Sequence, residues 1–510
     1  MKSMPRRRFV AVGVTAAIAG SLLMSAPVQA AASLSTKPVV VARTADIDKL
    51  DPHLATAFQT VQTLGLVFGT LVELKTDLSI APGLATSWKF DDGAKTITFK
   101  LRKNVVFHNG AKFTSADVKA TFTRILDEKT AAVGRSNFTS ISRIVAPDPE
   151  TVVFVLNDPS VPLLAALTDV NASILSAADI RAGTVGTKPN GTGPFMWSSW
   201  KVGQSIQLKA NPKYWGGKPK ISGVTFRVIP TETSALAAVK ANSAQMALIS
   251  DPIVARQAGT AVTTYRVGSL SYHALQLNAR SPQLSDVNVR LAIQCAVDRQ
   301  GVLNTAALGE GAVTGPITSP AYKSSTTARP CPKRDLVKAK AYMAAAGKSN
   351  ITLTTIVSQG EYATAIAEAQ TLQAQLKDIG INLDLQVTDI ATYVKRWLAA
   401  DFDAAIALNG GRVDPDTMYK RYFTSTGNLN KIAGYSSATL DDLFVKGRST
   451  DNVKQRKAIY NQISAELENN AVWIWMFTSY DYSIATKKLK GFQPMPNASL
   501  QNLRAASLLK

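Results

Sequence analysis

Two charged residues in one short segment, Arg412 and Asp414, have the chemistry to bind a charged small molecule. They stand in the sequence GGRVDP at residues 410–415. The guanidinium of Arg412 is a planar fork that suits a carboxylate or a phosphate, although a surface or structural ion pair would use the same group. Asp414 could bind an amine, but Asp followed by Pro also fits the N-cap and first turn of a helix over 416–422. The segment predicts an anion contact at Arg412 and leaves two roles open for Asp414.

The three histidines give no indication of a metal site or of catalysis. His53, His108 and His273 are far apart, and none has another His, a Cys or a close carboxylate at the spacing that metal ligands need. The sequence also lacks a Gly-x-Ser-x-Gly elbow and a glycine-rich phosphate loop. We therefore predict no enzymatic activity, no metal and no cofactor.

The elements that must position Arg412 alternate between strand and helix. After a helix predicted over 286–302, apolar residues at alternate positions predict a strand over 381–387, and short apolar segments predict further strands over 351–357 and 402–408. Helices between such strands make right-handed crossovers, so the strands lie parallel in one doubly wound sheet. Ligands bind beyond the carboxyl ends of such strands. The loops at those ends are 358–361, 388–390 and 409–415.

The first half of the chain is richer in short strands. Residues 97–101 alternate apolar and polar side chains after a turn at 91–93, and Thr114 with Asp117 predicts the N-terminus of a helix. Far later, an apolar run at 471–477 predicts a strand that returns the chain to this first part. The sequence thus indicates an α/β protein with two core-bearing halves.

The N-terminus has the pattern of an export signal. Lys2 and the arginines at 6–8 precede an uncharged stretch over 9–36, with a small-residue cleavage site at 28–30. This stretch is too rich in Ala, Gly, Ser and Thr for a spanning helix, and no cysteine stands directly after the cleavage site to carry a lipid. We expect a signal peptide at 1–30 and a free periplasmic protein, exported by the general secretory or the twin-arginine route.

The net charge and the cysteines fit that compartment. A formal net charge of +21 raises the possibility of nucleic-acid binding, but the basic residues are scattered and no recognition motif accompanies them. We predict no nucleic-acid partner and a solvated basic surface, with attraction to anionic solutes or membranes left open. Cys295 and Cys331 are the only cysteines, and an oxidising compartment favours a disulfide between them.

Four segments, in order, resemble one family. They are LDPH at 50–53; DG at 92–93 through FHNG at 107–110 to ADV at 116–118; GTGPF at 191–195 with NPKYWGG at 211–217; and Asn278 with VRLAI at 289–293 and AVDR at 296–299. These sequence segments are similar to those of the solute-binding proteins of oligopeptide, dipeptide and nickel ABC importers, called extracellular solute-binding family 5. The resemblance spans most of the chain.

The resemblance implies a fold and a function. The fold is the two-lobed periplasmic-binding-protein type, type II-like, with crossing hinge strands. Lobe I would comprise 31–268 and 481–510, with a subdomain inserted at about 55–185, and lobe II would comprise 269–480. The function would be to bind a short peptide or peptide-like solute between the lobes. A monomer would then deliver it to the ABC permease at the inner membrane.

The chain departs from the family pattern at one important place. Peptide-binding relatives use Trp-x-x-Asp-x-x-Asp/Glu-Pro to supply a carboxylate for the peptide amino terminus. Here Leu408 holds the Trp position and Gly411 the Asp position, so this clamp is missing. An anionic or amphoteric solute, such as an opine or a sugar phosphodiester, is therefore an alternative. Alternatives of another class are a periplasmic hydrolase and a peptide-binding chaperone.

The remaining candidate site residues follow from the resemblance and from side-chain chemistry. Gln59 and Thr60 stand where relatives line the wall of the first lobe. Gly410 and Gly411 let a solute approach the backbone closely. Tyr480, at the end of the returning strand, could stack on a solute or offer its hydroxyl group.

Overall fold

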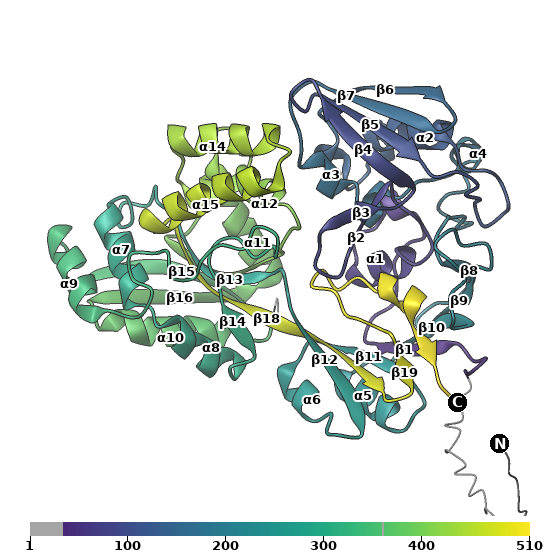
Figure 1. Cartoon of the computed structure of the whole chain (residues 1–510). Coiled ribbons are helices and arrows are strands. Elements are labelled where there is room, and N and C mark those ends of the chain that lie inside the picture. Colours follow the sequence, from purple (N-terminus) through teal and green to yellow (C-terminus); the bar gives the residue numbers. More distant parts are fainter. Residues whose placement is uncertain (1–33, 360–361) are drawn as a thin grey trace, which may run out of the picture.

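The computed structural model describes residues 34–359 and 362–510, which form two lobes joined side by side (Figure 1). One 12-stranded sheet runs through both lobes. Its order along the main path is β16-β15-β17-β13-β18-β11-β1-β10-β9-β8. The predicted signal peptide at 1–30 lies outside the described residues.

The first lobe holds one end of this sheet and the second lobe the other. The strands of the first lobe are β1 (Val39–Arg43), β8 (Phe195–Lys201), β9 (Ser205–Ala210), β10 (Gly223–Val228), β11 (Met246–Ile249) and β12 (Val262–Gly268). Those of the second lobe are β13 (Tyr272–Leu277), β14 (Gly311–Val313), β15 (Ile351–Gln359), β16 (Ile381–Asp389) and β17 (Ala404–Asn409).

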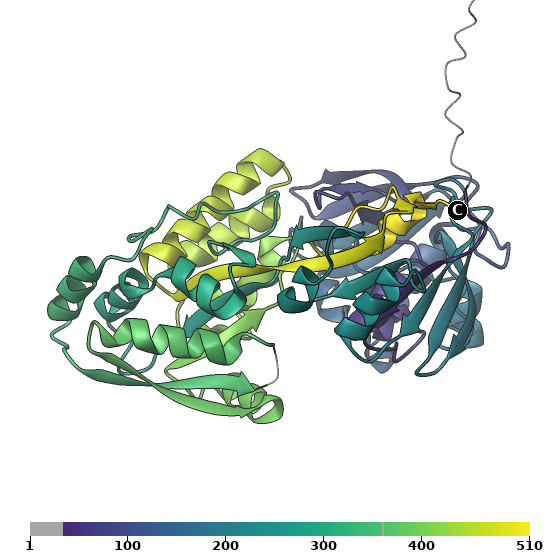
Figure 2. The same ribbon diagram turned by 90° about the horizontal axis from the view of Figure 1, so that it is seen from below.

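One long strand, β18 (Trp473–Thr486), belongs to both lobes. Its first half pairs with β13, from Trp473 opposite Gln276 to Phe477 opposite His273, and its second half pairs with β11 and β12. The strand crosses the narrow waist between the lobes, as Figure 2 shows. The chain makes a second crossing where β12 ends at Gly268 and β13 begins at Tyr272. Two adjacent crossings form a hinge about which lobes can close.

The second lobe has the predicted parallel units. β15 pairs in parallel with both β16 and β17, from Ile351 opposite Ile381 and from Thr355 opposite Ala404. The helices on this part of the sheet are α7 (Val287–Ala296), α8 (Arg299–Ala307), α9 (Leu336–Ala345), α10 (Ala365–Lys377) and α11 (Ile390–Ala399). The later ones are α12 (Pro415–Phe423), α13 (Asn430–Ala433), α14 (Ala438–Ser449) and α15 (Val453–Asn469). The prediction of parallel strands joined by helices is confirmed, although β13 and β18 run antiparallel in the same sheet.

The single helix predicted over 286–302 is wrong. The structure has two helices, because the Asp298 side chain accepts a hydrogen bond from the Gly301 backbone amide at 3.0 Å and caps the start of α8. Val297, between the helices, has extended backbone angles. An N-capping acid inside an apolar helical pattern is enough to divide it.

The first lobe carries a second sheet. Its strands, in the order β4-β5-β7-β6, are β4 (Ala85–Asp91), β5 (Thr96–Leu101), β6 (Ile141–Asp148) and β7 (Thr151–Leu156). The helix α2 (Ser115–Leu126) packs on it and begins with the predicted capping box, in which Asp117 accepts from the Thr114 backbone amide at 2.8 Å. The other helices of this lobe are α1 (Phe58–Leu64), α3 (Leu163–Ala166), α4 (Ala177–Ala182), α5 (Glu232–Lys240) and α6 (Pro252–Arg256).

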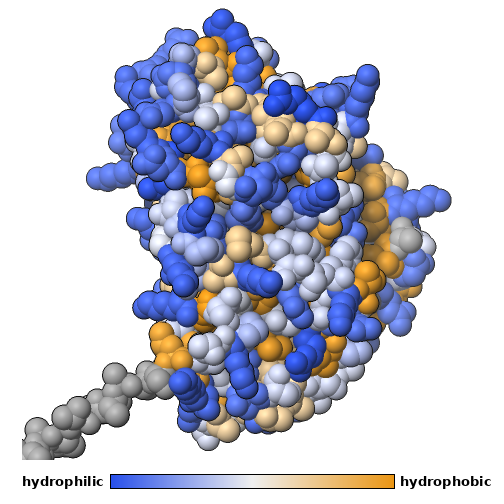
Figure 3. All heavy atoms as spheres, turned by 90° about the vertical axis from the view of Figure 1, so that its right-hand side faces the viewer, coloured by the Kyte–Doolittle hydropathy of each residue, from blue (hydrophilic) through white to orange (hydrophobic). Residues whose placement is uncertain are grey.

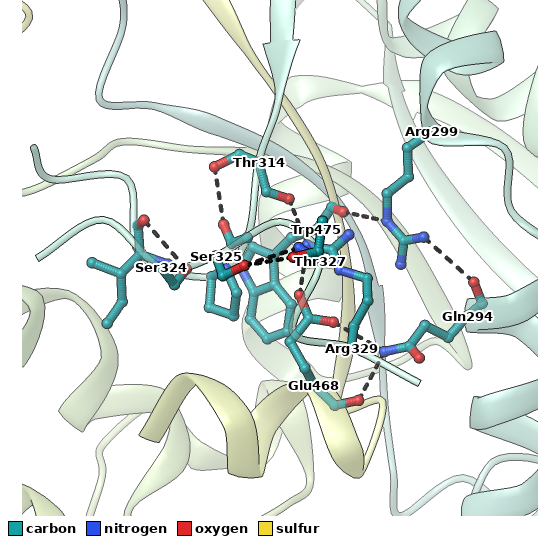
Figure 4. Close-up of polar contacts among 12 residues, drawn as sticks. Gln294, Arg299, Thr314, Ser324, Ser325, Thr327, Arg329, Glu468 and Trp475 are labelled. Carbon is teal, nitrogen blue, oxygen red and sulfur yellow. Dashed lines mark hydrogen bonds and ion pairs between the residues drawn. The ribbon is translucent and has the colours of Figure 1, made fainter. Parts of the chain in front are cut away.

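A long loop of the second lobe, residues 314–332, is held to the core by a disulfide and by buried charges. Cys331 is bonded to Cys295 of α7, with the Cα atoms 5.0 Å apart. Two residues before Cys331, Arg329 lies 2.9 Å from Glu468 of α15 and donates to the Thr314 carbonyl oxygen (Figure 4). The loop therefore packs as part of the second lobe.

The surface of the first lobe is polar over most of its outer face. Figure 3 shows hydrophilic side chains over this face, with hydrophobic ones in small groups between them. Within residues 34–359 and 362–510, no helix is both long and apolar enough to cross a membrane.

Candidate functional site

A cavity of about 530 Å³ lies between the lobes. The first lobe lines it with parts of residues 55–74, 168–173 and 193–215, and the second lobe with residues 410–413. The crossing segments contribute residues 269–271 and Asp481. A smaller cavity of about 170 Å³ beside the hinge shares five lining residues with the larger one: Phe58, Gln62, Asp481, Ala498 and Ser499. The volume of the larger cavity and its position between the lobes suit a small organic solute.

The loop after β17 forms the second-lobe wall. Gly410, Gly411 and Arg412 all line the cavity, as the sequence predicts for this loop. A Cβ atom on Gly411 would stand 2.0 Å from the Leu270 carbonyl oxygen, so no other residue fits there without a shift of the backbone. The described residues of the other two predicted loops, 358–361 and 388–390, do not line either cavity. Among the residues that the structure describes, one strand end of the three therefore contributes to the site.

Two charged groups in the cavity neutralise each other. Arg504 places its Nη1 atom 2.7 Å from Glu73 Oε2 and donates a hydrogen bond to the Tyr214 hydroxyl at 2.9 Å. Burial raises the pKa of Tyr214 to about 12, so it stays neutral. These three side chains form a closed polar cluster on the first-lobe wall.

Two other acids face the cavity, and no cation in the described part of the chain is close enough to form an ion pair with either. Burial raises the pKa of Asp169 to about 6, and Arg412 on the other lobe opposes that rise by its positive charge. Burial likewise raises the pKa of Asp481 to about 6, opposed by a hydrogen bond from Ser269. An acid whose charged form is poorly solvated gains most from a bound cation.

The two predicted residues on the first-lobe wall have different surroundings. Gln59 lines the smaller cavity, and its backbone carbonyl accepts a hydrogen bond from Arg43 at 3.0 Å. Thr60 is fully buried, and its hydroxyl donates to Asp48 at 2.6 Å. Thr60 is not among the residues that line the two cavities. Gln59 is thus the one of this pair that a solute can reach.

Asp414 points away from the cavity. It caps α12 by accepting from the Asp416 backbone amide at 2.9 Å, the second of its two predicted roles. Its carboxylate also lies 2.5 and 2.9 Å from the two terminal nitrogens of Arg456. Both partners are buried, so a solute contact at Asp414 would have to compete with this ion pair.

Tyr480 and the histidines also have protein partners. The Arg266 guanidinium lies 4.2 Å from the centre of the Tyr480 ring, which is outside both cavity walls. His53 lies between Arg124 and the Ser173 carbonyl oxygen, and burial lowers its pKa to about 4. In the described part of the chain, no group of three or more His, Cys, Asp or Glu residues could hold a metal ion.

Sequence reasoning missed Asp169, Asp481, Glu73 and Arg504. None stands in a recognisable motif, and each reaches the cavity only through the tertiary fold. Two of the family-like segments could have indicated part of the cavity wall. The segments GTGPF and NPKYWGG place Gly193, Pro194, Tyr214 and Trp215 in the cavity wall.

Comparisons with known proteins agree with this geometry. A profile described as bacterial extracellular solute-binding proteins, family 5 Middle, matches residues 79–430. The probable D,D-dipeptide-binding periplasmic protein DdpA of Escherichia coli (strain K12) is 29% identical over 473 residues, which cover 89% of this chain and 91% of that protein.

Solved structures show the same architecture. HbpA2 from Haemophilus parasuis matches with a TM-score of 0.84 at 24% identity, over 93% of this chain and 100% of that one. The PBP AgaA in complex with agropinic acid, from A. tumefacien R10, matches with a TM-score of 0.74 at 26% identity, over 93% of this chain and 99% of that one. These matches confirm the predicted two-lobed fold.

Proposed function

Because the chain belongs to the bacterial extracellular solute-binding proteins of family 5, we propose that it captures a short peptide or peptide-like solute between its lobes. It then delivers that solute to the permease of an ABC importer at the inner membrane. The observation that carries this proposal is the cavity between the lobes, whose walls present charges of both signs. A relative named as a probable D,D-dipeptide-binding protein supports the peptide class.

The mechanism follows from the hinge. A solute that contacts both walls favours the closed arrangement of the lobes, because it binds that arrangement more tightly than the open one. The closed form is the one that docks on the permease. The protein works as a monomer in the periplasm after removal of residues 1–30. A micromolar affinity corresponds to about −8 kcal/mol, which a few charged contacts and buried hydrogen bonds can supply.

The direct test is native mass spectrometry of the protein purified from its own periplasm. We expect a co-purified molecule with the mass of a short peptide, released on mild unfolding. The released peptide should stay intact on further incubation with the protein, since we propose no catalysis. A non-peptide mass would contradict the peptide class, and cleavage products would revive the hydrolase alternative.

A non-peptide anionic or amphoteric solute is the second candidate. It is favoured by the positive charge of Arg412 in a loop where Gly411 leaves no room for an acidic side chain. A protein of similar structure, AgaA, holds agropinic acid. The same mass measurement separates this candidate from the first, because such a solute has a different composition.

A further inference from the structure

Two charged side chains of the cavity, Asp169 and Arg412, differ from its other charges. Glu73 and Arg504 neutralise each other, and Asp481 accepts a hydrogen bond from Ser269. By contrast, neither Asp169 nor Arg412 forms a side-chain hydrogen bond or an ion pair with any residue in the described ranges. Their charges are available to a molecule in the cavity.

Asp169 and Arg412 come from opposite walls. Asp169 precedes a short turn of the first lobe at Val170–Ala172, and Arg412 follows β17 of the second lobe. They are too far apart to form an ion pair, yet the charge of Arg412 acts on the Asp169 carboxylate. An opposite pair held apart across a cavity is what a dipolar molecule needs to bridge two lobes.

The loop geometry fixes the sign of the charge on the second-lobe wall. Gly411 cannot carry a side chain, since its Cβ would meet the Leu270 backbone, and Asp414 is already paired with Arg456. Arg412 is therefore the only charged side chain that residues 410–414 present to the cavity. A negative charge that could bind the positive group of a dipolar molecule must therefore come from the first-lobe wall, and Asp169 supplies it there.

We propose that Asp169 and Arg412 form the two ends of one subsite, in which the Asp169 carboxylate binds an ammonium group and the Arg412 guanidinium binds a carboxylate of the same solute. The inference rests on the proposed function and narrows its substrate class to dipolar solutes with separated charges. The amine end lies on the first lobe and the acid end on the second. Both charges must be present for the solute to draw the lobes together.

The test combines two protein variants with two chemical modifications of each peptide ligand. Ala-Ala and Ala-Ala-Ala are measured by isothermal titration calorimetry beside their N-acetyl forms, which lack the ammonium group, and their amides, which lack the carboxylate. 6-Aminohexanoate serves as a dipolar probe without a peptide bond. The variants are Asp169→Asn and Arg412→Gln. Asp92→Asn and Arg143→Gln are matched controls, because both residues are exposed and lie outside the cavity.

Each lost charge contact should raise Kd about 10- to 100-fold. With the native protein, acetylation and amidation should each cause such a rise. In Asp169→Asn the free peptide should already bind weakly, and acetylation should add little. In Arg412→Gln the free peptide should also bind weakly, and amidation should add little. Neither Asp92→Asn nor Arg143→Gln should change Kd.

The outcomes separate the two proposals. If peptides bind but the variants still respond fully to both ligand modifications, the subsite is wrong and the proposed function stands. If only 6-aminohexanoate binds, with the expected variant pattern, the subsite stands and the peptide class fails. If the native protein binds no dipolar probe in the panel, the subsite is wrong.

Discussion

The cavity between the lobes and the interior of the second lobe both hold charged side chains, but these side chains have different surroundings. Inside the second lobe, Arg299 and Arg329 surround Glu468, and each has at least one protein partner (Figure 4). In the cavity, the side chains of Asp169 and Arg412 have no hydrogen-bonding partner among the described residues. Burial alone does not distinguish a charged side chain that stabilises the fold from one that is available to a solute. A hydrogen-bonding or ion-pair partner within the protein does distinguish them.

The same contrast occurs within one short loop. Arg412 is exposed to the cavity, whereas Asp414, two residues later, is buried and paired with Arg456. A charge that already satisfies a buried partner contributes to stability, because its loss leaves that partner unpaired. A charge that faces only solvent contributes little to stability and is available for recognition. Substitutions in the two regions should therefore affect different measurements.

The largest expected effect is on stability and comes from Glu468→Gln. This change removes the acid paired with the buried Arg329 and one of the two acids that act on the buried Arg299, which should lower the free energy of unfolding by about 3–5 kcal/mol. Denaturant unfolding at neutral pH measures it. Arg412→Gln is the matched cavity variant and should change the free energy by less than about 0.5 kcal/mol. Equal losses in the two variants would remove the distinction between the regions.

The disulfide should be the next largest contribution. Replacing both Cys295 and Cys331 by Ser opens a loop with a sequence separation of 36 residues. The chain-entropy model gives a loss of about 4 kcal/mol, because the unfolded chain gains conformational freedom. Unfolding of the native protein with and without a reductant measures the same quantity independently. A loss in the Ser variant that reductant does not reproduce in the native protein would indicate a packing effect instead.

A smaller effect should depend on pH and come from Asp416. Burial raises the pKa of Asp416 to about 7, and its Oδ1 atom has no hydrogen-bond partner among the described residues. Because the folded pKa exceeds the ordinary value of 3.8, the native state binds the proton more tightly and loses stability as pH rises from about 4 to about 7. Asp416→Asn should therefore be the more stable protein above pH 7, by on the order of 2 kcal/mol.

Unfolding of both proteins at a series of pH values checks this. The difference between them should disappear below about pH 3, where the wild-type carboxyl is protonated in both the folded and the unfolded state. A difference that stays constant over the whole range would show that the Asn side chain acts through packing rather than through titration.

The parts of this molecule that sequence predicts well are those set by neighbouring residues. The capping box of Thr114 and Asp117 and the alternation at the start of β16 involve residues a few positions apart, and both are present in the structure. The prediction of a single helix over 286–302 is wrong because Asp298 caps the start of a second helix, although the capping contact, with Gly301, is also local. Local patterns therefore predict elements reliably once each polar residue is given a role.

The candidate site was only partly predictable, for a physical reason. Arg412 could be found because a strand end and two glycines precede it in the sequence. Asp169 could not be found, since its loop has no recognisable sequence pattern. Asp169 becomes a candidate only because the fold places it in the same cavity as Arg412 of the other lobe. Asp414 was ambiguous for the same reason, because its ion pair is with Arg456 on a distant helix. A charge is assigned to recognition or to folding by long-range contacts that sequence spacing does not encode.

The smallest expected effect concerns solute affinity and pH. Asp169 has a pKa of about 6 in the cavity, so it is charged at pH 7 and becomes mostly neutral by pH 5. A solute that uses its ammonium group there should bind about tenfold more weakly at pH 5 than at pH 7, because the carboxyl must first lose a proton. Calorimetric titration with Ala-Ala at several pH values measures this change.

The other charged groups around the cavity decide how that result is interpreted. Asp481 also has a pKa of about 6, whereas Arg412, Arg504 and Glu73 complete the charged lining. Asp169→Asn removes one of the two acids that titrate near pH 6 and leaves the other. If the pH dependence of Kd is unchanged in this variant, the ammonium group contacts Asp481 instead. If most of the pH dependence of Kd is lost in this variant, the Asp169 carboxylate is the group that binds the ammonium group of the solute.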